Sequence, residues 1–255
     1  MTIGDAVTAP AVPTTEDGLL GGRVRLRQHG CGYRAGIDPV LLAAAVPAAA
    51  GQSVLDAGAG AGAAALCLAA RVPGVRLVLL ESEPQAAALA RENAARSGAD
   101  PRPEVWEGDL ASPPAEVAGA RFDHVMSNPP YMPRSRGTVA SARGVAARQE
   151  GTLDLGGWVR ACCRRTAPRG SVTFVHRADR LDELVAALAA AGAGGVTLLP
   201  LWPRRGADAK RILVRASPGS RAPARLLSGL VLHGDGAAFT SEAQAILRDA
   251  AALAL

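Results

Sequence analysis

The residues with the clearest chemical potential follow a short apolar run, in "FDHVMSNPPYMPRSRG" at residues 122–137. A proline lacks an amide hydrogen and disfavours the helical region for the residue before it, so the chain must end its strand and turn at Asn128-Pro129-Pro130. A planar exocyclic amine is a poor nucleophile, because its lone pair is delocalised into the ring. The side-chain oxygen of Asn128 and the carbonyl of Pro129 could accept both amine hydrogens and direct that lone pair at a methyl donor, while Tyr131 stacks on the flat group. These four residues are the candidate catalytic group, and the chemistry needs no strong general base.

Three other segments carry residues suited to an adenosine-bearing ligand. The glycines of "LDAGAGAG" (residues 55–62) let the backbone turn sharply and approach a ligand that a Cβ atom would exclude. About twenty residues later, a carboxylate at the end of an apolar run could accept two hydrogen bonds from a ribose diol, and the aspartate of "EGDL" could accept one from an adenine amine. Each feature alone also has a structural explanation. The glycines fit a tight turn, the carboxylate fits a helix cap, and the aspartate fits an ordinary turn residue. Their order and spacing predict one donor site, with the residues Gly58, Gly60, Gly62, Glu81 and Asp109.

The elements that must position these residues alternate between short apolar strands and helices. This alternation predicts an α/β fold with a seven-stranded, mostly parallel sheet and helices on both faces. Two closing strands without a long helix between them predict an antiparallel edge. Ligands of open α/β sheets sit beyond the carboxyl ends of the strands, where the first four strand ends should converge. The expected strands are residues 53–58, 75–80, 103–109, 122–127, 171–176, 195–202 and 211–216, and the expected helices include 61–71, 84–97, 155–166 and 181–191.

The chain also divides into a leader and one domain. The first residues lack the basic start and apolar middle of a secretory signal, and they are expected to form a flexible leader. The remainder reads as a single domain with an extension after its core. The expected boundaries are residues 1–18 for the leader and 19–255 for the domain, with an N-terminal strand and helix segment at 19–50, a catalytic core at 51–216 and a C-terminal strand and helix extension at 217–255.

Composition narrows the functional classes. The net charge of +5 suits a polyanionic partner such as nucleic acid, and the basic residues cluster between residues 204 and 225. No run of about twenty apolar residues is free of charges and Gly/Pro breaks, so no membrane helix is expected and the protein is predicted to be cytoplasmic. The cysteines form no CxxC pair and the histidines are scattered, which argues against a disulfide framework or a metal site.

The motifs together resemble a known family. "VLDAGAGAG", "LESEPQAAALAREN", "EGD" and "FDHVMSNPPY" occur in the order found in class I S-adenosylmethionine-dependent methyltransferases that carry an NPPY motif. "GYRAGIDPVLLAAAV", "LPLWPRRGADAKRILV" and "LVLHGDGAAFTSEAQAIL" extend the resemblance to the bacterial tRNA1(Val) (adenine-N6)-methyltransferase family, over roughly residues 19–250. The resemblance implies a Rossmann-like class I methyltransferase fold, S-adenosyl-L-methionine as the methyl donor and tRNA as a partner.

The resemblance also implies roles for individual residues. Asp56 and the glycines would border the methionine part of the donor, Glu81 its ribose and Asp109 its adenine. Asp38, which is also expected to cap a helix whose first position is Pro39, lies in a segment that the family places near the donor. Asn128 to Tyr131 would hold the target amine. The residues expected to contact RNA phosphates are Arg134, Arg136, Arg204, Arg205 and Lys210.

Other acceptors and roles stay open on the sequence alone. The same corner suits a glutamine amide of a protein, as in release-factor methyltransferases, although these usually carry a helical N-terminal domain. Another base amine is a further alternative, and a binding protein that has lost catalysis is opposed by the intact corner and glycine loop. The side chains of His176 and His233 are interpreted as structural, and so are the adjacent thiols of Cys162 and Cys163.

Overall fold

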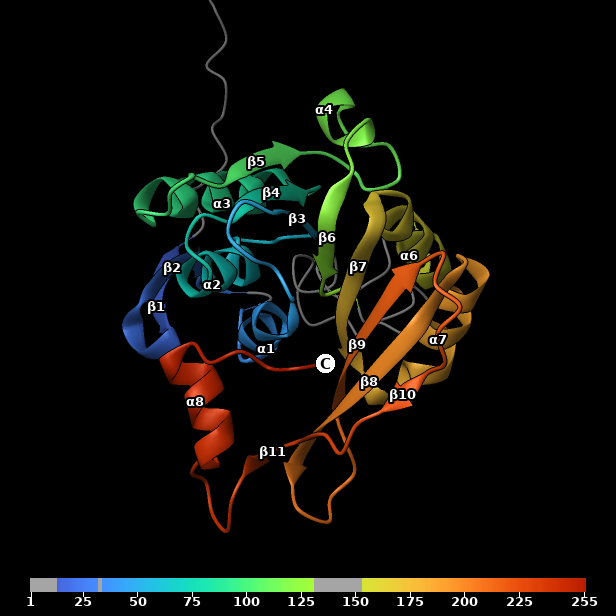
Figure 1. Cartoon of the computed structure of the whole chain (residues 1–255). Coiled ribbons are helices and arrows are strands. Elements are labelled where there is room, and N and C mark those ends of the chain that lie inside the picture. Colours follow the sequence, from blue (N-terminus) through green and yellow to red (C-terminus); the bar gives the residue numbers. More distant parts are fainter. Residues whose placement is uncertain (1–12, 32–33, 131–152) are drawn as a thin grey trace, which may run out of the picture.

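A computed structural model describes residues 13–31, 34–130 and 153–255. The strands in these ranges are β1 (Thr14–Leu19), β2 (Val24–His29), β3 (Ser53–Ala57), β4 (Arg76–Glu81), β5 (Glu104–Glu107), β6 (Phe122–Ser127), β7 (Thr166–Arg177), β8 (Ala193–Arg204), β9 (Arg211–Pro218), β10 (Arg225–Leu226) and β11 (Leu230–His233). The first two pair as a separate hairpin. The others form one sheet in the order β10-β8-β9-β7-β6-β3-β4-β5, with β11 also on β8 (Figure 1).

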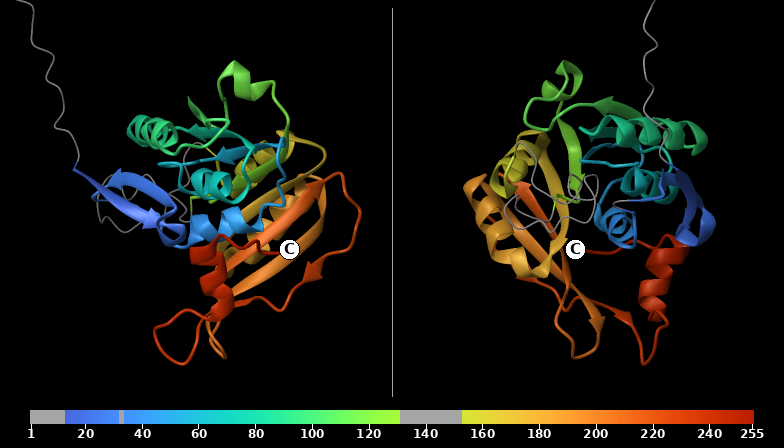
Figure 2. Two further views of the ribbon diagram at one scale, coloured as in Figure 1. Left: turned by 60° about the vertical axis from the view of Figure 1, so that its left-hand side comes forward. Right: turned by 180° about the vertical axis from the view of Figure 1, so that it is seen from behind.

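The helices cover both faces of this sheet, as predicted (Figure 2). They are α1 (Asp38–Ala45), α2 (Ala63–Arg71), α3 (Pro84–Arg96), α4 (Ala115–Ala118), α6 (Leu155–Arg164), α7 (Leu181–Ala190) and α8 (Ser241–Asp249), with 3-10 turns η1 (Leu20–Gly22) and η3 (Ala178–Arg180). Successive side chains of a strand point to opposite faces. Val54 of β3 therefore packs in the core with α1, α2 and α8, whereas its neighbour Leu55 packs in the core with α6 and α7.

The sheet topology fixes which strand ends meet. Strands β6, β3, β4 and β5 are parallel neighbours, so their carboxyl ends lie along one edge, where the sequence predicted the site. Strand β9 is antiparallel to both β7 and β8. The closing strands β8 and β9 thus form the predicted antiparallel end of the sheet, with β9 between β7 and β8, so that β8 runs parallel to β7. The carboxyl end of β8 consequently points to the same edge as those of β3 to β6.

Short additions extend the predicted framework at both ends. The predicted leader of residues 1–18 ends too late, because β1 already begins at Thr14 and pairs with β2. Strands β10 and β11, two and four residues long, pair with β8 and raise the strand count above the predicted seven within the described residues. Helix α8 is capped by Thr240, whose side chain accepts a hydrogen bond from the amide of Ala243, and it packs against α1 and the β1–β2 turn. Within the described ranges, no helix is long and apolar enough to cross a bilayer.

Candidate functional site

The turn after β3 has the backbone geometry that its glycines predict. Gly58, Gly60 and Gly62 have φ angles of 74°, 57° and 89°, in the left-handed region that other residues rarely adopt. The amides of Gly58 and Ala59 donate to the carbonyl of Leu80 in β4, at 2.8 and 3.1 Å. This glycine turn is thereby fixed to the neighbouring strand before the chain enters α2.

The carboxylate of Glu81, the last residue of β4, faces the glycine turn. Its Oε2 accepts a hydrogen bond from the amide of Gly60 at 2.7 Å, and its Oε1 accepts one from the amide of Glu83 at 2.9 Å. Burial raises the pKa of Glu81, and these backbone hydrogen bonds oppose the rise. Two features that the sequence assigned to one donor site are thus in direct contact.

Asp56 lies beneath this surface, one residue before the end of β3. Its side chain is buried, and its Oδ2 has no hydrogen-bond partner among the described residues. Burial raises the pKa of Asp56 to about 7, opposed by the backbone amide of Ala65 and reinforced by the charge of Glu81. A buried carboxyl group with an unused oxygen, close to the glycine turn, fits a ligand that carries positive charge.

Asp109 lies just beyond β5, at the same edge. The amide of the preceding Gly108 donates to the carbonyl of Glu81 at 2.9 Å, which joins the ends of β4 and β5. Oδ1 of Asp109 accepts a hydrogen bond from the amide of Ala111 at 2.9 Å. The side chain thus stabilises its own turn beside the end of β4.

Asp38 is not the helix cap that the sequence predicted. Helix α1 begins at Asp38 itself, with Ile37 in the N-cap position and no side-chain cap. The carboxylate of Asp38 instead accepts a hydrogen bond from Nε of Arg211, the first residue of β9, at 2.9 Å. A charge-assisted hydrogen bond of this kind is stronger than a neutral one, so the carboxylate joins α1 to β9.

The proline corner is fixed to the glycine turn. Strand β6 ends at Ser127, whose Oγ donates to the carbonyl of Ala57 at 2.7 Å, directly before the turn. Asn128 and Pro130 are half-buried and Pro129 is buried. The candidate acceptor residues and the candidate donor residues are therefore neighbours. The predicted site residues Tyr131, Arg134 and Arg136 lie outside the described residues.

A tryptophan that was not among the predicted site residues lies at this junction. The indole Nε1 of Trp158 donates to Oγ of Ser127 at 2.9 Å, and a Cβ atom on Gly58 would lie only 3.0 Å from the indole ring. Asp154 caps α6 by accepting a hydrogen bond from the amide of Gly157 at 2.6 Å, which starts the helix just before the tryptophan. No motif marks Trp158, and the capping aspartate predicts only the helix.

Comparison with known proteins agrees with this geometry. The family model of the methyltransferase small domain matches residues 34–176, a range that holds the glycine turn, Glu81, Asp109 and the proline corner. The chain belongs to the methyltransferase small-domain family. A glycopeptide N-methyltransferase, MtfA, crystallised with S-adenosyl-L-methionine, shares the fold with a TM-score of 0.51 at 15% identity, covering 74% of this chain and 97% of that one.

Several relatives of this methyltransferase are more similar in sequence. The tRNA1(Val) (adenine(37)-N6)-methyltransferase of Aeromonas hydrophila is 35% identical over 190 residues, which cover 74% of this chain and 78% of that protein. The enzyme of the same name from Aeromonas salmonicida is 32% identical over 82% of this chain and 86% of its own length. A crystal structure described as a predicted O-methyltransferase, Atu636 from Agrobacterium tumefaciens, has a TM-score of 0.69 and 31% identity, covering 86% of this chain and 99% of that one.

The basic segment that follows β8 in the methyltransferase does not form one surface. Arg204 ends β8, and Arg205 and Lys210 follow it on the β8–β9 turn; all three are exposed at the carboxyl edge of the sheet (Figure 1). Arg221 and Arg225 are exposed near the amino end of β8, since Arg225 pairs with Thr197. The first group, named here the basic turn, is therefore the part of the segment on the side of the site.

Other candidate side chains of the methyltransferase fit structural roles. Burial lowers the pKa of His176 to about 4, and burial raises the pKa of Cys162, so neither is poised as a base or nucleophile near neutral pH. His233 stacks on Phe239 at 4.7 Å between ring centroids, far along the C-terminal extension. Cys163 is also buried.

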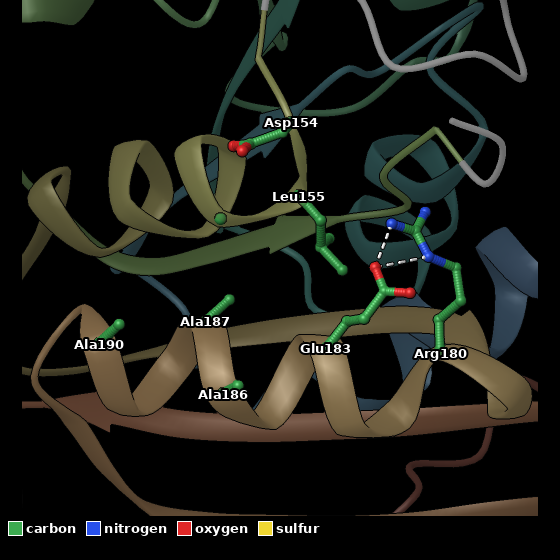
Figure 3. Close-up of a pocket in the computed structure, with 8 residues that line it drawn as sticks. Asp154, Leu155, Arg180, Glu183, Ala186, Ala187 and Ala190 are labelled. Atoms are coloured by element: carbon green, nitrogen blue, oxygen red, sulfur yellow. Dashed lines mark hydrogen bonds and ion pairs between the residues drawn. The ribbon is translucent and has the colours of Figure 1, made fainter. Parts of the chain in front are cut away.

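A hollow between α6 and α7 is separate from the site. It has a volume of about 460 Å³, and Arg180 donates a hydrogen bond to Glu183 at 2.5 Å at the start of α7 (Figure 3). Its other described lining residues include three alanines of α7 and the start of α6. None belongs to the glycine turn or the proline corner. The hollow offers an ion pair and methyl groups, which do not match the donor.

Proposed function

We propose that this methyltransferase transfers a methyl group from S-adenosyl-L-methionine to the N6 amine of an adenine in tRNA, in the cytoplasm. The observation that carries the proposal is the Ser127–Ala57 hydrogen bond, which holds the Asn128-Pro129-Pro130 corner directly beside the glycine turn. An amine placed at the corner would therefore lie next to a donor placed at the turn. The Aeromonas relatives named as tRNA1(Val) (adenine(37)-N6)-methyltransferases support the same acceptor.

The corner favours a nitrogen acceptor over an oxygen one. A primary amine on a ring has two hydrogens, which Asn128 Oδ1 and the carbonyl of Pro129 can accept together. A hydroxyl has one hydrogen and needs a base to remove it as the oxygen attacks. The described ionisable groups in the site are carboxyl groups assigned to the donor. The relative described as a predicted O-methyltransferase therefore supports the fold and the family here, and the corner supports N-methylation.

Catalysis at this corner rests on positioning. Hydrogen bonds from both amine hydrogens to these acceptors would make the nitrogen pyramidal, which weakens the conjugation of its lone pair with the ring and directs that lone pair at the donor. The donor supplies an electrophilic methyl group, so the nitrogen forms the new N–C bond while the C–S bond breaks and its electron pair stays on sulfur. The nitrogen is then cationic and releases one proton to water. Asn128 and Pro129 stabilise that cationic nitrogen because both present oxygen acceptors.

The donor residues follow the strand ends in order. Asp56 would face the positive side of the donor from beneath the turn, Glu81 would accept hydrogen bonds from the ribose, and Asp109 would accept one from the adenine amine. At its three glycines the turn presents backbone without a Cβ atom. A Cβ atom on Gly60 would contact nothing within 4 Å, so the turn is open at that position.

Glu81→Gln is expected to raise the Kd for S-adenosyl-L-methionine about thirtyfold, which corresponds to roughly 2 kcal/mol, a typical value for hydrogen bonds to a charged group. An amide has one acceptor oxygen, so it cannot serve both ribose hydroxyls. Isothermal titration calorimetry measures the change. Glu83→Gln is the matched control, because Glu83 caps α3 two residues away and should leave the Kd within about twofold. Equal weakening by both variants would contradict the ribose assignment.

The acceptor is tested by methyl transfer from labelled donor. The protein is incubated with labelled S-adenosyl-L-methionine and total tRNA that lacks the modification, and the nucleosides are analysed by mass spectrometry. N6-methyladenosine in one tRNA species is the expected product. Label in another nucleoside would agree with an RNA methyltransferase but would contradict adenine N6 as the acceptor. Absence of label from RNA would overturn the tRNA assignment.

A protein amide is the second candidate acceptor. The release factor glutamine methyltransferase of Geobacter sulfurreducens is 44% identical, but over 81 residues that cover 27% of its length. A planar side-chain amide also has two hydrogens, which the same corner can accept. Label entering protein and not RNA, in a parallel extract, would move the assignment to glutamine.

The basic turn should bind the tRNA backbone. Replacing Arg204, Arg205 and Lys210 together by alanine is expected to raise the KM for tRNA about tenfold. The salt dependence of KM should also fall, because the variant makes fewer phosphate contacts and its binding therefore releases fewer counterions. The Kd for the donor should not change. Steady-state kinetics at several salt concentrations measure both effects. The control variant replaces three exposed arginines near the amino ends of strands, Arg121, Arg221 and Arg225. An equal effect in the control would show that only the net charge matters.

A further inference from the structure

The indole ring of Trp158 contacts both the end of β6, which leads into the proline corner, and the glycine turn. Its Nε1 donates to Oγ of Ser127 at 2.9 Å, and that same oxygen donates its own hydrogen to the carbonyl of Ala57 at 2.7 Å. The three groups form a chain from α6, through the last residue of β6, to the last residue of β3. The indole ring also fills the space where Gly58 would carry a side chain.

This series of hydrogen bonds holds the side chain of Ser127 more firmly than a single hydrogen bond would. Oγ of Ser127 is fully buried, so it must satisfy both its donor and its acceptor capacity inside the protein. Ala57 uses the donor capacity and Trp158 uses the acceptor capacity. These two hydrogen bonds restrict the rotamer of the hydroxyl and the position of the end of β6. The position of Ser127 in turn constrains Asn128, the next residue along the chain.

We infer that Trp158 is a positioning residue for methyl transfer, which acts through Ser127 to hold Asn128 at a fixed distance from the donor turn. The inference rests on the proposed function, in which Asn128 holds the target amine. Trp158 reaches the site through Ser127 and Gly58. Its indole packs against the glycine turn from the helix side, so its environment should also report donor binding.

Trp202 provides a matched comparison for this role. Its Nε1 also donates a single hydrogen bond, to the carbonyl of Ser228 at 3.1 Å, and it lies on β8 with no contact to the turn or corner among the described interactions. Trp158→Phe and Trp202→Phe therefore remove the same group and one hydrogen bond each. A purely structural tryptophan would make the two variants alike in activity per folded molecule.

The kinetic test compares kcat with donor affinity. Trp158→Phe is expected to lower kcat about tenfold, while the Kd for S-adenosyl-L-methionine stays within about twofold and Trp202→Phe changes neither. Because Trp158 acts through the hydroxyl, the double variant Trp158→Phe/Ser127→Ala should have the same kcat as Ser127→Ala alone. Multiplying effects, or equal kcat values for the two tryptophan variants, would overturn the inference. Thermal unfolding of each variant confirms that the compared proteins are folded.

A spectroscopic test does not depend on the acceptor. Nitrogen-15 spectra resolve the indole N–H groups of Trp106, Trp158 and Trp202, and each is assigned by its Phe variant. Ser127→Ala and saturating S-adenosyl-L-methionine should each shift the Trp158 signal and leave the Trp202 signal in place. A Trp158 signal that responds to neither would overturn the inference even if tRNA is methylated. If tRNA is not methylated, a shifted Trp158 signal still supports the link, and only the acceptor is wrong.

Discussion

Asn128→Ala is expected to lower methyl transfer about a thousandfold or more, while the Kd for S-adenosyl-L-methionine stays within about threefold. The side-chain oxygen at this position is one of the two acceptors that would turn the amine toward the donor. Without this oxygen the lone pair of the amine stays delocalised into the ring, and the amine has no fixed orientation. The donor residues lie at or just after the ends of β3, β4 and β5, so their contacts should survive the substitution. Single-turnover kinetics measure transfer, and calorimetry measures donor binding.

Asn128→Asp is the matched variant for this experiment. It keeps oxygen acceptors at the same distance from the backbone, so it should retain more transfer than Asn128→Ala at every pH at which the carboxyl is ionised. An alanine variant that turns over like the wild type would defeat the proposed role of Asn128. Loss of donor binding in step with transfer would instead place Asn128 in the donor site.

The sequence predicted those parts of the site that depend on local chain geometry. The strand at residues 122–127 was predicted with the bounds of β6, because two prolines end it sharply. The glycine turn was predicted because three positive φ angles need glycine. The edge at which these segments meet followed from parallel strands, which share their carboxyl ends.

Contacts between distant segments could not be predicted in the same way. Asp38 has the local signature of a helix cap, but its partner is Arg211, far along the chain, and an ionised partner outcompetes the amides of a first turn. Trp158 looks like any aromatic residue on a packed helix until β6 places Ser127 under its indole. The insertion of β9 between β7 and β8 depends on how the closing hairpin folds back, which pattern alone does not specify.

Asp56→Asn is expected to stabilise the protein against unfolding by about 3 to 4 kcal/mol above pH 7, and by almost nothing near pH 4. In the folded chain burial raises the pKa of Asp56 to about 7, from an ordinary value of 3.8. The folded state therefore holds a proton that the unfolded state releases. The stability that this proton provides is complete below about pH 4, is lost as the pH rises toward 7, and does not return above it. Asparagine cannot ionise, so the variant avoids this loss.

Urea unfolding of both proteins between pH 4 and pH 8.5 measures the difference in free energy. Other groups that titrate, such as His176, contribute equally to both proteins and cancel in the difference. Asp123→Asn is the control, because hydrogen bonds from the backbone and side chain of Ser53 lower the pKa of Asp123. Its difference from the wild type should stay constant from pH 5 to pH 8, since Asp123 is ionised in both states there. A constant difference for Asp56→Asn over the same range would show that Asp56 is ionised in the folded protein without a donor. A rising difference would mean that the protein tolerates a destabilising carboxyl group beneath the glycine turn, where a cationic donor would favour its ionised form.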